Sequence, residues 1–206
     1  MNLLELFAGS RSVGRAGGGC WYTVFSTDIH AFDGIDYVVD ILEFDYEKVP
    51  FIPDVLWASP PCTWFSVAAI GRNWTKGSLE PKTETARIWL LLLHKTLDMI
   101  EYYKKLNPSL IWYIENPRGM MRKMPCMDNL LRHTVTYCQY WDTRMKPTDI
   151  WTNNMRWIPR KACSNWDTCH VSAPRGSSTG TQGLKWAYER SKIPEALCIE
   201  VLQACK

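Results

Sequence analysis

The fold of this chain is decided by the stretch Asp54-Val55-Leu56-Trp57-Ala58-Ser59-Pro60-Pro61-Cys62-Thr63-Trp64-Phe65-Ser66. Its apolar beginning, residues 54–57, predicts a buried strand. The two prolines stop that strand, since proline continues neither a helix nor a central strand. Cys62 is therefore expected on a turn at the carboxyl end of a strand, where open α/β sheets bind their ligands. The alternative is a rigid loop that holds an inert thiol.

A second apolar run, residues 110–114, is followed by Glu115-Asn116-Pro117. The same order of strand, polar group and proline thus occurs twice, which favours a functional thiol over an inert one. A thiol and a carboxylate at adjacent strand ends would provide a nucleophile and a proton donor for one substrate.

The N-terminal part has the features of a nucleotide-type site. Residues 3–7 predict a short buried strand, and Ala8-Gly9-Ser10 after it allows a tight turn close to a ligand. Such turns also occur for packing alone. Residues 21–27 predict a second strand that ends at Asp28, where an acidic side chain typically accepts hydrogen bonds from ribose hydroxyls. Asp40 is either a further ligand contact or a helix cap.

Two helices are expected later in the chain. Residues 85–106 have helical composition and spacing, with Ile88, Leu92 and Leu97 on one side. Residues 190–205 predict a final helix with Pro194 in its first turn.

The segments between them predict one strand and several loops. Residues 135–139 predict the strand, and residues 76–85 predict a polar loop. Residues 118–129, rich in methionine and basic side chains, are expected to form a second, mobile loop. Residues 153–181 show no period and contain prolines, glycines and serines.

Length and composition predict a single domain. The chain has 206 residues, of which 46% are hydrophobic, and a net charge of +3. This charge permits nucleic-acid binding without requiring it. The longest purely apolar run, residues 88–93, is too short to cross a bilayer, so no membrane association is expected. Eight cysteines without an export signal predict reduced thiols and a cytoplasmic protein.

The chain resembles the DNA cytosine-5 methyltransferases in four features. They are the glycine turn, the acidic residue after the second strand, Pro-Cys followed by Phe-Ser, and Glu-Asn-Pro. The pieces stand in that family's order. Residues 1–66 match closely, residues 111–121 match well, and the remainder matches in fragments. The small size is similar to that of solitary phage and bacterial enzymes, which implies the cytoplasm of a bacterium or a phage-infected cell.

The resemblance implies a fold, a cofactor and a substrate. The expected fold is α/β, a Rossmann-like S-adenosylmethionine-dependent methyltransferase sheet flanked by helices, with a small irregular recognition segment. The expected partner is double-stranded DNA, and the chain is expected to act as a monomer. It implies domain bounds of 1–152 for the catalytic part, 153–181 for a reduced target-recognition segment, and 182–206 for a helix returning to the cofactor site.

The resemblance also implies three groups of site residues. Its catalytic residues are Cys62, Glu115 and Arg144. S-adenosylmethionine is expected against Glu5, Phe7, Gly9, Asp28, Ile29, Asp40 and Pro60. The target base and its DNA are expected against Pro61, Ser66, Asn116, Pro117, Gln139 and Lys146.

The implied chemistry requires these residue types. A Cys62 thiolate that adds to carbon 6 of cytosine makes carbon 5 nucleophilic enough to take a methyl group. A free thiol with a pKa of about 8.5 has to be activated for this at neutral pH. Glu115 would protonate nitrogen 3, a step that burial of the carboxyl favours. The base must leave the DNA stack, at a cost of a few kcal/mol.

The basic residues after Gln139 match the family less well. The family has Gln-x-Arg-x-Arg at this point, whereas this chain has Gln139 and, after a gap, Arg144-x-Lys146. Arg144 is the better candidate for contacting the base and its phosphate, because a guanidinium presents a rigid fork of donors. The alternative is an Arg-x-Lys pair on a solvated edge.

Cysteine and histidine also cluster in the recognition segment. Cys163, Cys169 and His170 are candidates for a zinc site. A fourth ligand is not evident from the spacing, although Cys138 or Cys126 would be able to supply it, and the sequence as a whole predicts no metal.

Three other functions remain open at the level of sequence. Residues 58–61 resemble the Ser-Pro-Pro-Tyr of enzymes that methylate the exocyclic amine of cytosine or adenine, although Cys62 and Glu115 argue against that chemistry. A non-catalytic DNA-binding protein on the same fold is the second. Methylation of free nucleotide or RNA is the third.

Overall fold

A computed structural model describes residues 1–63, 65–66, 70–171, 184 and 186–206. The described chain forms one seven-stranded sheet in the order β3-β2-β1-β4-β5-β7-β6. The strands are β1 (Asn2–Leu6), β2 (Thr23–Asp28), β3 (Tyr37–Val38), β4 (Val55–Ala58), β5 (Ile111–Pro117), β6 (Arg132–Thr136) and β7 (Pro147–Thr152).

The first five strands are parallel to one another, and β7 and β6 extend the sheet at one edge with antiparallel pairing. β1 pairs in parallel with β2 and β4, and β4 pairs in parallel with β5. β7 runs antiparallel to both β5 and β6. The strand order reverses between β1 and β4, so the crevice at their carboxyl ends is where this type of sheet binds ligands. This confirms the expected Rossmann-like class of fold.

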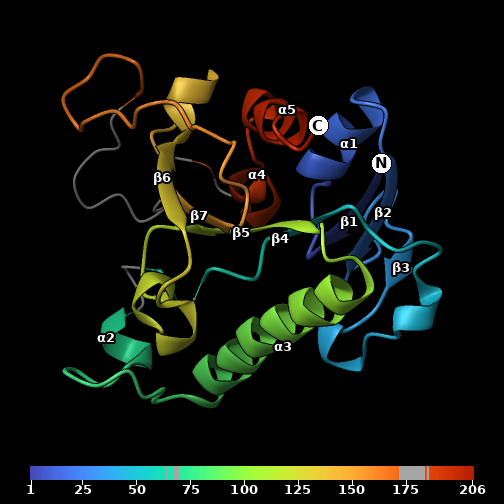
Figure 1. The fold of residues 1–206 in the computed structure, drawn as a ribbon. Helices are drawn as coiled ribbons and strands as arrows, with labels where there is room; N and C mark the ends of the chain where they lie inside the picture. The colour runs from blue at the N-terminus through green and yellow to red at the C-terminus, as the bar shows by residue number, and fades with distance from the viewer. Residues whose placement is uncertain (64, 67–69, 172–183, 185) are drawn as a thin grey trace.

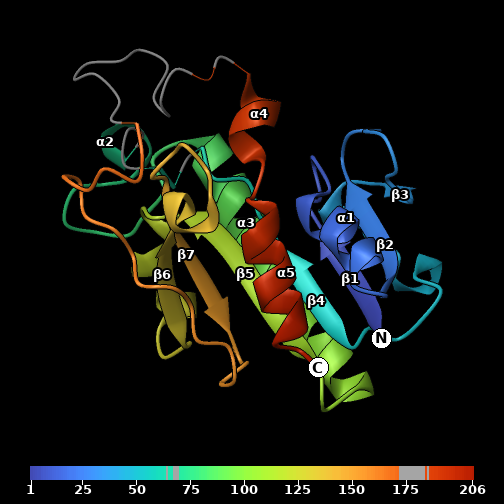
Figure 2. The same ribbon diagram turned by 90° about the horizontal axis from the view of Figure 1, so that it is seen from above.

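Helices cover both faces of the sheet (Figures 1 and 2). α1 (Ser12–Gly19) and α5 (Glu195–Gln203) pack against each other on one face, and α3 (Glu84–Leu106) crosses the other. α2 (Ile70–Asn73) and α4 (Ala187–Ser191) are short. Each face has its own apolar cluster, one under α3 and one under α1 and α5. Between them the strands are buried on both faces, and all four residues of β4 are fully buried.

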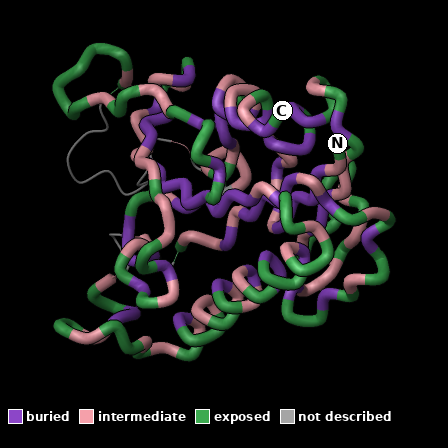
Figure 3. The backbone as a smooth tube through the Cα atoms, viewed as in Figure 1, coloured by how far each residue is buried: buried purple, intermediate pink, exposed green. Residues whose placement is uncertain are grey.

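Local sequence explains why α3 begins one residue before its expected start and ends where expected. The Thr83 hydroxyl accepts a hydrogen bond from the Ala86 N–H (3.2 Å), and Lys104 and Lys105 stand in the last turn, where positive charge suits the helix dipole. The apolar side of this helix was predicted correctly at Leu92 and Leu97, which are partly buried and pack against the core under α3, and wrongly at Ile88. Ile88 is 40% exposed, whereas Leu93, Met99 and three others face the core: Ala86, Ile100 and Tyr103. In Figure 3 the outer surface of α3 is correspondingly exposed.

Two predicted strands differ from the observed ones. β2 begins at Thr23 because Trp21 has a positive φ of 64° and is 89% exposed. The strand predicted over residues 135–139 ends at Thr136, which pairs with Pro147, the first residue of β7. Beyond that pair the chain turns into a 3-10 helix, η6 (Tyr137–Tyr140).

The methionine-rich loop and the last helix also differ from expectation. Residues 118–129 form two 3-10 turns, η4 (Met121–Lys123) and η5 (Pro125–Met127), whose methionines are buried in the core under α3, so this segment is packed rather than a mobile loop. The final helix is split into α4 and α5. Pro194 lacks an N–H and caps α5 instead of extending α4.

The end of β7 at Thr152 coincides with the boundary predicted for the catalytic part. Residues 153–171 contain no helix or strand, and residues 172–181, the rest of the predicted recognition segment, lie outside the described part of the chain. Among the described residues, no helix is both long and apolar enough to cross a membrane.

Candidate active site

Cys62 lies on a loop that is fixed to the end of β5. β4 and β5 are neighbours, paired from Val55↔Ile111 to Ala58↔Ile114. The Asn116 side-chain amide donates a hydrogen bond to the Pro60 carbonyl (2.8 Å), so it holds the loop just before Cys62. The Asn116 Oδ1 atom is buried without a hydrogen-bond partner among the described residues, which leaves an acceptor at this position.

A second contact fixes the loop just after Cys62. The Met120 N–H donates to the Phe65 carbonyl (2.6 Å), and the Phe65 N–H donates to the Cys62 carbonyl (3.1 Å). Gly119 makes this approach possible, because a Cβ atom there would lie 2.2 Å from the Phe65 carbonyl oxygen. Phe65 itself is buried and stacks on Trp74. The chain that carries Glu115 therefore holds both sides of the Cys62 loop.

Glu115 lies within β5 rather than after it, because antiparallel β7 continues the pairing as far as Pro117↔Thr148. Its side chain is 5% exposed and accepts a hydrogen bond from the Tyr137 hydroxyl (3.0 Å). Burial first, and the Glu115 carboxylate second, raise the pKa of Tyr137 well above its usual value. Tyr137 is thus a permanent donor that fixes one oxygen of Glu115. No local sequence pattern indicated a role for Tyr137.

Burial and positive charge act in opposite directions on the Cys62 thiol. Burial raises its pKa, Lys146 and Arg190 lower it, and the Glu115 carboxylate raises it further; the net effect is a raised pKa. Burial also lowers the pKa of the Lys146 ammonium, although Glu115 and Cys62 oppose this. Lys146 donates to the Arg190 carbonyl (2.9 Å). The charges of Cys62, Glu115 and Lys146 therefore influence one another. Arg190 also acts on Cys62, and the sequence analysis did not include it in the site.

Arg144 is occupied by contacts within the protein. It is 6% exposed and forms an ion pair with Asp142, at 2.9 and 3.0 Å from its Nε atom. Burial raises the pKa of Asp142, but hydrogen bonds from Arg144 outweigh this and lower it overall. Arg144 also donates to the carbonyls of residues 189, 190 and 192. Arg144 is therefore neither exposed nor on a solvated edge.

The cofactor residues predicted from sequence gather at the carboxyl ends of β1 and β2. Gly9 has a positive φ of 51°, and its N–H donates to the Asp28 carboxylate (2.9 Å). The other Asp28 oxygen accepts from the His30 N–H (2.9 Å). Each carboxylate oxygen has two acceptor sites, so Asp28 keeps capacity for a pair of hydroxyls. Phe7 is next to this turn with a φ of 55°, and Ile29 is 59% exposed.

Two predicted cofactor residues have structural contacts of their own. One oxygen of Asp40 accepts a hydrogen bond from the Leu42 N–H (3.0 Å) and caps η1 (Ile41–Glu43). This is the helix-cap role that the sequence left open for Asp40. Glu5 is 2% exposed beneath α1, where it accepts from the Val13 N–H (3.1 Å) and the Ser26 hydroxyl (3.0 Å). Burial raises the pKa of Glu5 to about 7, against these hydrogen bonds, which lower it.

The C-terminal part contacts the start of α1, next to the glycine turn. The Ile193 N–H donates to the Ser12 hydroxyl (3.1 Å), 181 residues away in the chain. The Tyr188 ring of α4 lies 5.6 Å from the Phe32 ring, which follows β2. Residues 189–192 also accept the hydrogen bonds of Arg144 and Lys146, so this segment links the cofactor end of the site to the Cys62 end.

The other predicted substrate residues lie in two places. Pro61, Ser66 and Pro117 belong to the clamped loop and strand, and the Ser66 hydroxyl donates to the Thr63 carbonyl (2.8 Å). Gln139 lies apart from them, where its side-chain amide donates to Cys169 Sγ (3.3 Å).

The sheet and its flanking helices define a class of fold, the Rossmann-like α/β proteins. The Dnmt2 methyltransferase of S. pombe has the same fold, with a TM-score of 0.50 at 16% identity over 74% of this chain and 48% of that one. EhMeth of Entamoeba histolytica matches with a TM-score of 0.47 at 11% identity over 74% of this chain and 52% of that one. The chain therefore spans about half the length of the solved structures it matches.

No protein-family model matches the sequence. A protein of Frog virus 3 (isolate Goorha) named "Probable DNA (cytosine-5)-methyltransferase" is 34% identical over 232 aligned residues, which cover 100% of both sequences. At this identity over the full length, the chain belongs to the DNA (cytosine-5)-methyltransferase family.

Proposed function

We propose that this chain transfers a methyl group from S-adenosylmethionine to carbon 5 of cytosine in double-stranded DNA, through a covalent bond between Cys62 and the base. Membership of the family supports the reaction class. The observation that carries the residue assignment is the double clamp on the Cys62 loop, Asn116 to Pro60 on one side and Met120 to Phe65 on the other.

Cys62 begins the reaction as the nucleophile. A bond forms from its Sγ atom to carbon 6 of the base, and the electron pair of the 5,6 double bond moves to carbon 5. Because burial raises the pKa of Cys62, the thiolate depends on nearby positive charge, and Lys146 is the group that lowers this pKa most. After carbon 5 has gained its methyl group, it loses its proton to water, and the electron pair left behind re-forms the 5,6 double bond as the Sγ–carbon 6 bond breaks and Cys62 leaves as a thiolate.

Glu115 handles the proton at nitrogen 3. One of its oxygens is held by Tyr137, so the other faces the base with a fixed direction. The buried Asn116 Oδ1 has unused acceptor capacity that suits a donor on the flipped ring. Arg144 then has a positioning role, because it holds residues 189–192 beside Lys146.

The residues at the carboxyl ends of β1 and β2 fit S-adenosylmethionine, which supplies an electrophilic methyl group when bound. Asp28 has acceptor capacity for ribose hydroxyls, and the Gly9 turn allows close approach. Phe7, Ile29 and Pro60 offer apolar surface, and the free oxygen sites of Asp40 suit an amine. Glu5 supports this site from beneath α1 instead of touching the cofactor.

We assign target recognition to residues 153–181, in a chain that acts as a monomer and has residues 1–152 as its catalytic part and residues 182–206 as its return to the cofactor. The small size of this segment supports a short recognition sequence. The viral origin of the full-length relative supports action inside an infected host cell.

The proposal is tested by incubating varied double-stranded DNA with labelled S-adenosylmethionine and mapping the product at base resolution. We expect 5-methylcytosine with wild type and none with Cys62→Ser, which should still bind cofactor and DNA. Methyl groups on exocyclic amines would replace the proposal with the amino-methyltransferase alternative. Cofactor binding without methylation of DNA, RNA or nucleotides would favour a non-catalytic DNA-binding protein.

A further inference from the structure

We propose that Cys138, Cys163, Cys169 and His170 form a structural zinc site that fastens the recognition segment to the catalytic sheet. Their sulfur and ring-nitrogen atoms all lie within 4.8 Å of one another. None of the four belongs to the site described above. Cys138 is the fourth ligand that the spacing left undecided, whereas Cys126 packs against the core under α3.

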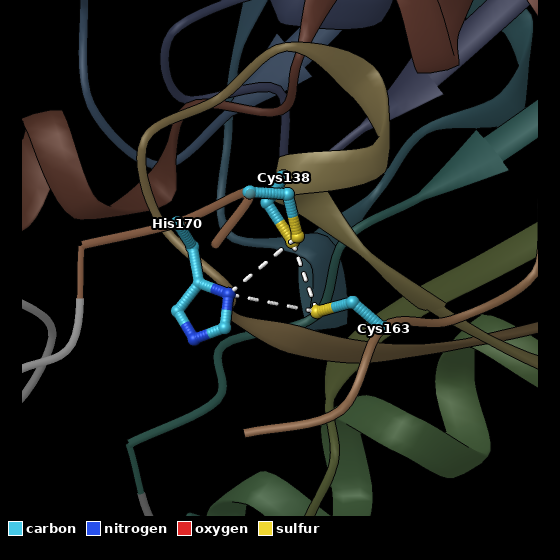
Figure 4. A group of neighbouring side chains, drawn as sticks. Cys138, Cys163 and His170 are labelled. Carbon is cyan, nitrogen blue, oxygen red and sulfur yellow. Dashed lines mark hydrogen bonds between the residues drawn. The ribbon is translucent and has the colours of Figure 1, made fainter. Parts of the chain in front are cut away.

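The distances among these atoms agree with ligands around a common centre. Cys138 Sγ lies 3.1 Å from Cys163 Sγ and 3.5 Å from Cys169 Sγ. His170 Nδ1 lies 3.7 Å from both Cys163 Sγ and Cys169 Sγ. With Zn–S bonds of about 2.3 Å, tetrahedral geometry places two sulfurs about 3.8 Å apart, so a small expansion would admit the ion. Figure 4 shows Cys138, Cys163 and His170 turned toward one another.

The chemistry of the donor set selects zinc among common metals. Three thiolates and one imidazole are the ligands of closed Cys₃His sites, which are structural because no position is left for a substrate. Hard cations such as Mg²⁺ and Ca²⁺ prefer oxygen ligands, which are absent from this set.

The surrounding hydrogen bonds hold the ligands in place. The Cys163 N–H donates to the Thr136 hydroxyl (2.9 Å), which ties the second ligand to the end of β6. Between Cys163 and Cys169, the Asp167 carboxylate accepts from the Ser164 N–H (2.7 Å) and closes a turn. The Gln139 amide donates to Cys169 Sγ, as outer-shell groups commonly do for thiolate ligands. This gives Gln139 a role near the metal instead of at the base.

The site joins two parts of the chain that are distant in sequence. Cys138 belongs to η6, and the other ligands belong to residues 163–170, which have no helix or strand. Directly after His170, the Val171 N–H donates to the Thr143 carbonyl (3.0 Å), one residue before Arg144. If residues 153–181 read DNA, a point that depends on the proposed function, the metal would fix the middle of that segment relative to the Arg144–Lys146 loop.

Metal content tests the site independently of methyl transfer. Protein produced with added zinc and purified without chelator is analysed by elemental mass spectrometry. We expect about one zinc per wild-type chain and eight free thiols after denaturation. Absence of zinc, iron in its place, or six free thiols and a Cys138–Cys163 disulfide would overturn the proposal.

Variants then identify the ligands. Cys169→Ser and His170→Ala remove partly exposed ligands and should lose at least about tenfold in zinc affinity, measured by competition with a chromophoric chelator. Gln139→Ala, which removes only a hydrogen bond to a ligand sulfur, should lose about 10-fold to 100-fold, less than either ligand variant. Cys20→Ser is the matched control and should keep full occupancy. Equal occupancy in Cys169→Ser, His170→Ala and the control would contradict the assignment.

A Co²⁺-substituted sample provides a second readout that does not depend on stability. Thiolate ligation gives an intense sulfur-to-cobalt charge-transfer band, which should weaken in Cys169→Ser and persist in Cys20→Ser. Full occupancy together with inactive protein would refute the proposed function and leave the zinc site standing. Active protein that contains no zinc would refute the zinc site and leave the proposed function standing.

Discussion

At the residue scale, Cys62 and Lys146 each favour the charged form of the other. Burial raises the pKa of the thiol, and Lys146 is the strongest of the groups that lower it. Removing the ammonium should therefore raise the pKa of Cys62 further, which lowers the thiolate fraction at neutral pH.

Lys146→Met should slow the alkylation of Cys62 by iodoacetamide at pH 7 and move its pH midpoint upward, and Lys146→Arg should largely preserve both. Mass spectrometry of the peptide containing Cys62 measures the rate at each pH. An unchanged pH midpoint in Lys146→Met would remove Lys146 from the thiol's environment.

Tyr137 is predicted to act by orienting Glu115. Tyr137→Phe should lower kcat by roughly 10-fold to 100-fold, since small displacements of a catalytic group are costly, while the KM for S-adenosylmethionine stays unchanged. Tyr22→Phe is the matched control, because it loses a hydrogen bond to the Leu202 carbonyl (2.8 Å) away from this site. Equal kcat values for the two variants would show that the Tyr137 hydroxyl does not serve catalysis.

Local sequence patterns predicted where Cys62 and Glu115 lie in the fold, but not which residues contact them. Cys62 and Glu115 follow apolar runs and lie close to prolines, and that local pattern predicted both at the carboxyl ends of strands, which the structure shows to be neighbours. Tyr137 and Arg190 come close to them only through tertiary packing, which no local pattern carries. The ion pair of Arg144 with Asp142 was likewise invisible, because both residues look like an ordinary solvated surface in the sequence.

At the scale of elements, the Cys62 loop and the end of β5 behave as one unit. Gly119 allows their backbones to meet, and a Cβ atom would be 2.2 Å from the Phe65 carbonyl oxygen. Since that oxygen belongs to the backbone, the loop itself would have to move.

Gly119→Ala should reduce stability by about 1–3 kcal/mol, as overpacking does, and reduce activity further because Cys62 shifts with the loop. The control is Gly18→Ala in α1, where a Cβ atom would meet nothing within 4 Å. That variant should be neutral or up to about 1 kcal/mol more stable. Thermal melts and methylation rates check both, and a fully active Gly119→Ala would refute the clamp.

Element prediction worked where the sequence has a strong apolar period or a clear cap. α3 began one residue before its expected start because Thr83 caps it. The predicted bounds of β6 were wrong because the end of the strand depends on where its partner β7 begins. Residues 118–129 were misjudged because their methionines fill the core, a role that composition cannot separate from an exposed loop.

At the scale of the whole molecule, the sheet carries a buried carboxyl group that makes stability depend on pH. The pKa of Glu5 is raised from 4.5 to about 7 in the folded protein by burial. Between these values the folded state keeps a proton that the unfolded state has released, so the stability contribution is full below pH 4.5 and is lost as pH rises through 7.

Glu5→Gln should therefore gain in stability relative to wild type as the pH rises from 5 to 8, by about 3 kcal/mol at 1.36 kcal/mol for each pKa unit. Glutamine can keep the bonds to the Val13 N–H and Ser26 hydroxyl, so the variant should fold. Urea unfolding at several pH values measures the difference. A constant difference across this range would mean that Glu5 is already ionised in the folded protein.

The central claim for the molecule is a covalent bond between Cys62 and the target base, and trapping on DNA with 5-fluorocytosine at the target positions tests it most directly. Fluorine at carbon 5 cannot leave as a proton does, so the Sγ–carbon 6 bond should persist. We predict a complex that survives denaturing gel electrophoresis, requires S-adenosylmethionine, maps to Cys62 and is absent from Cys62→Ser. A wild-type protein that methylates ordinary DNA but forms no such complex would contradict the account.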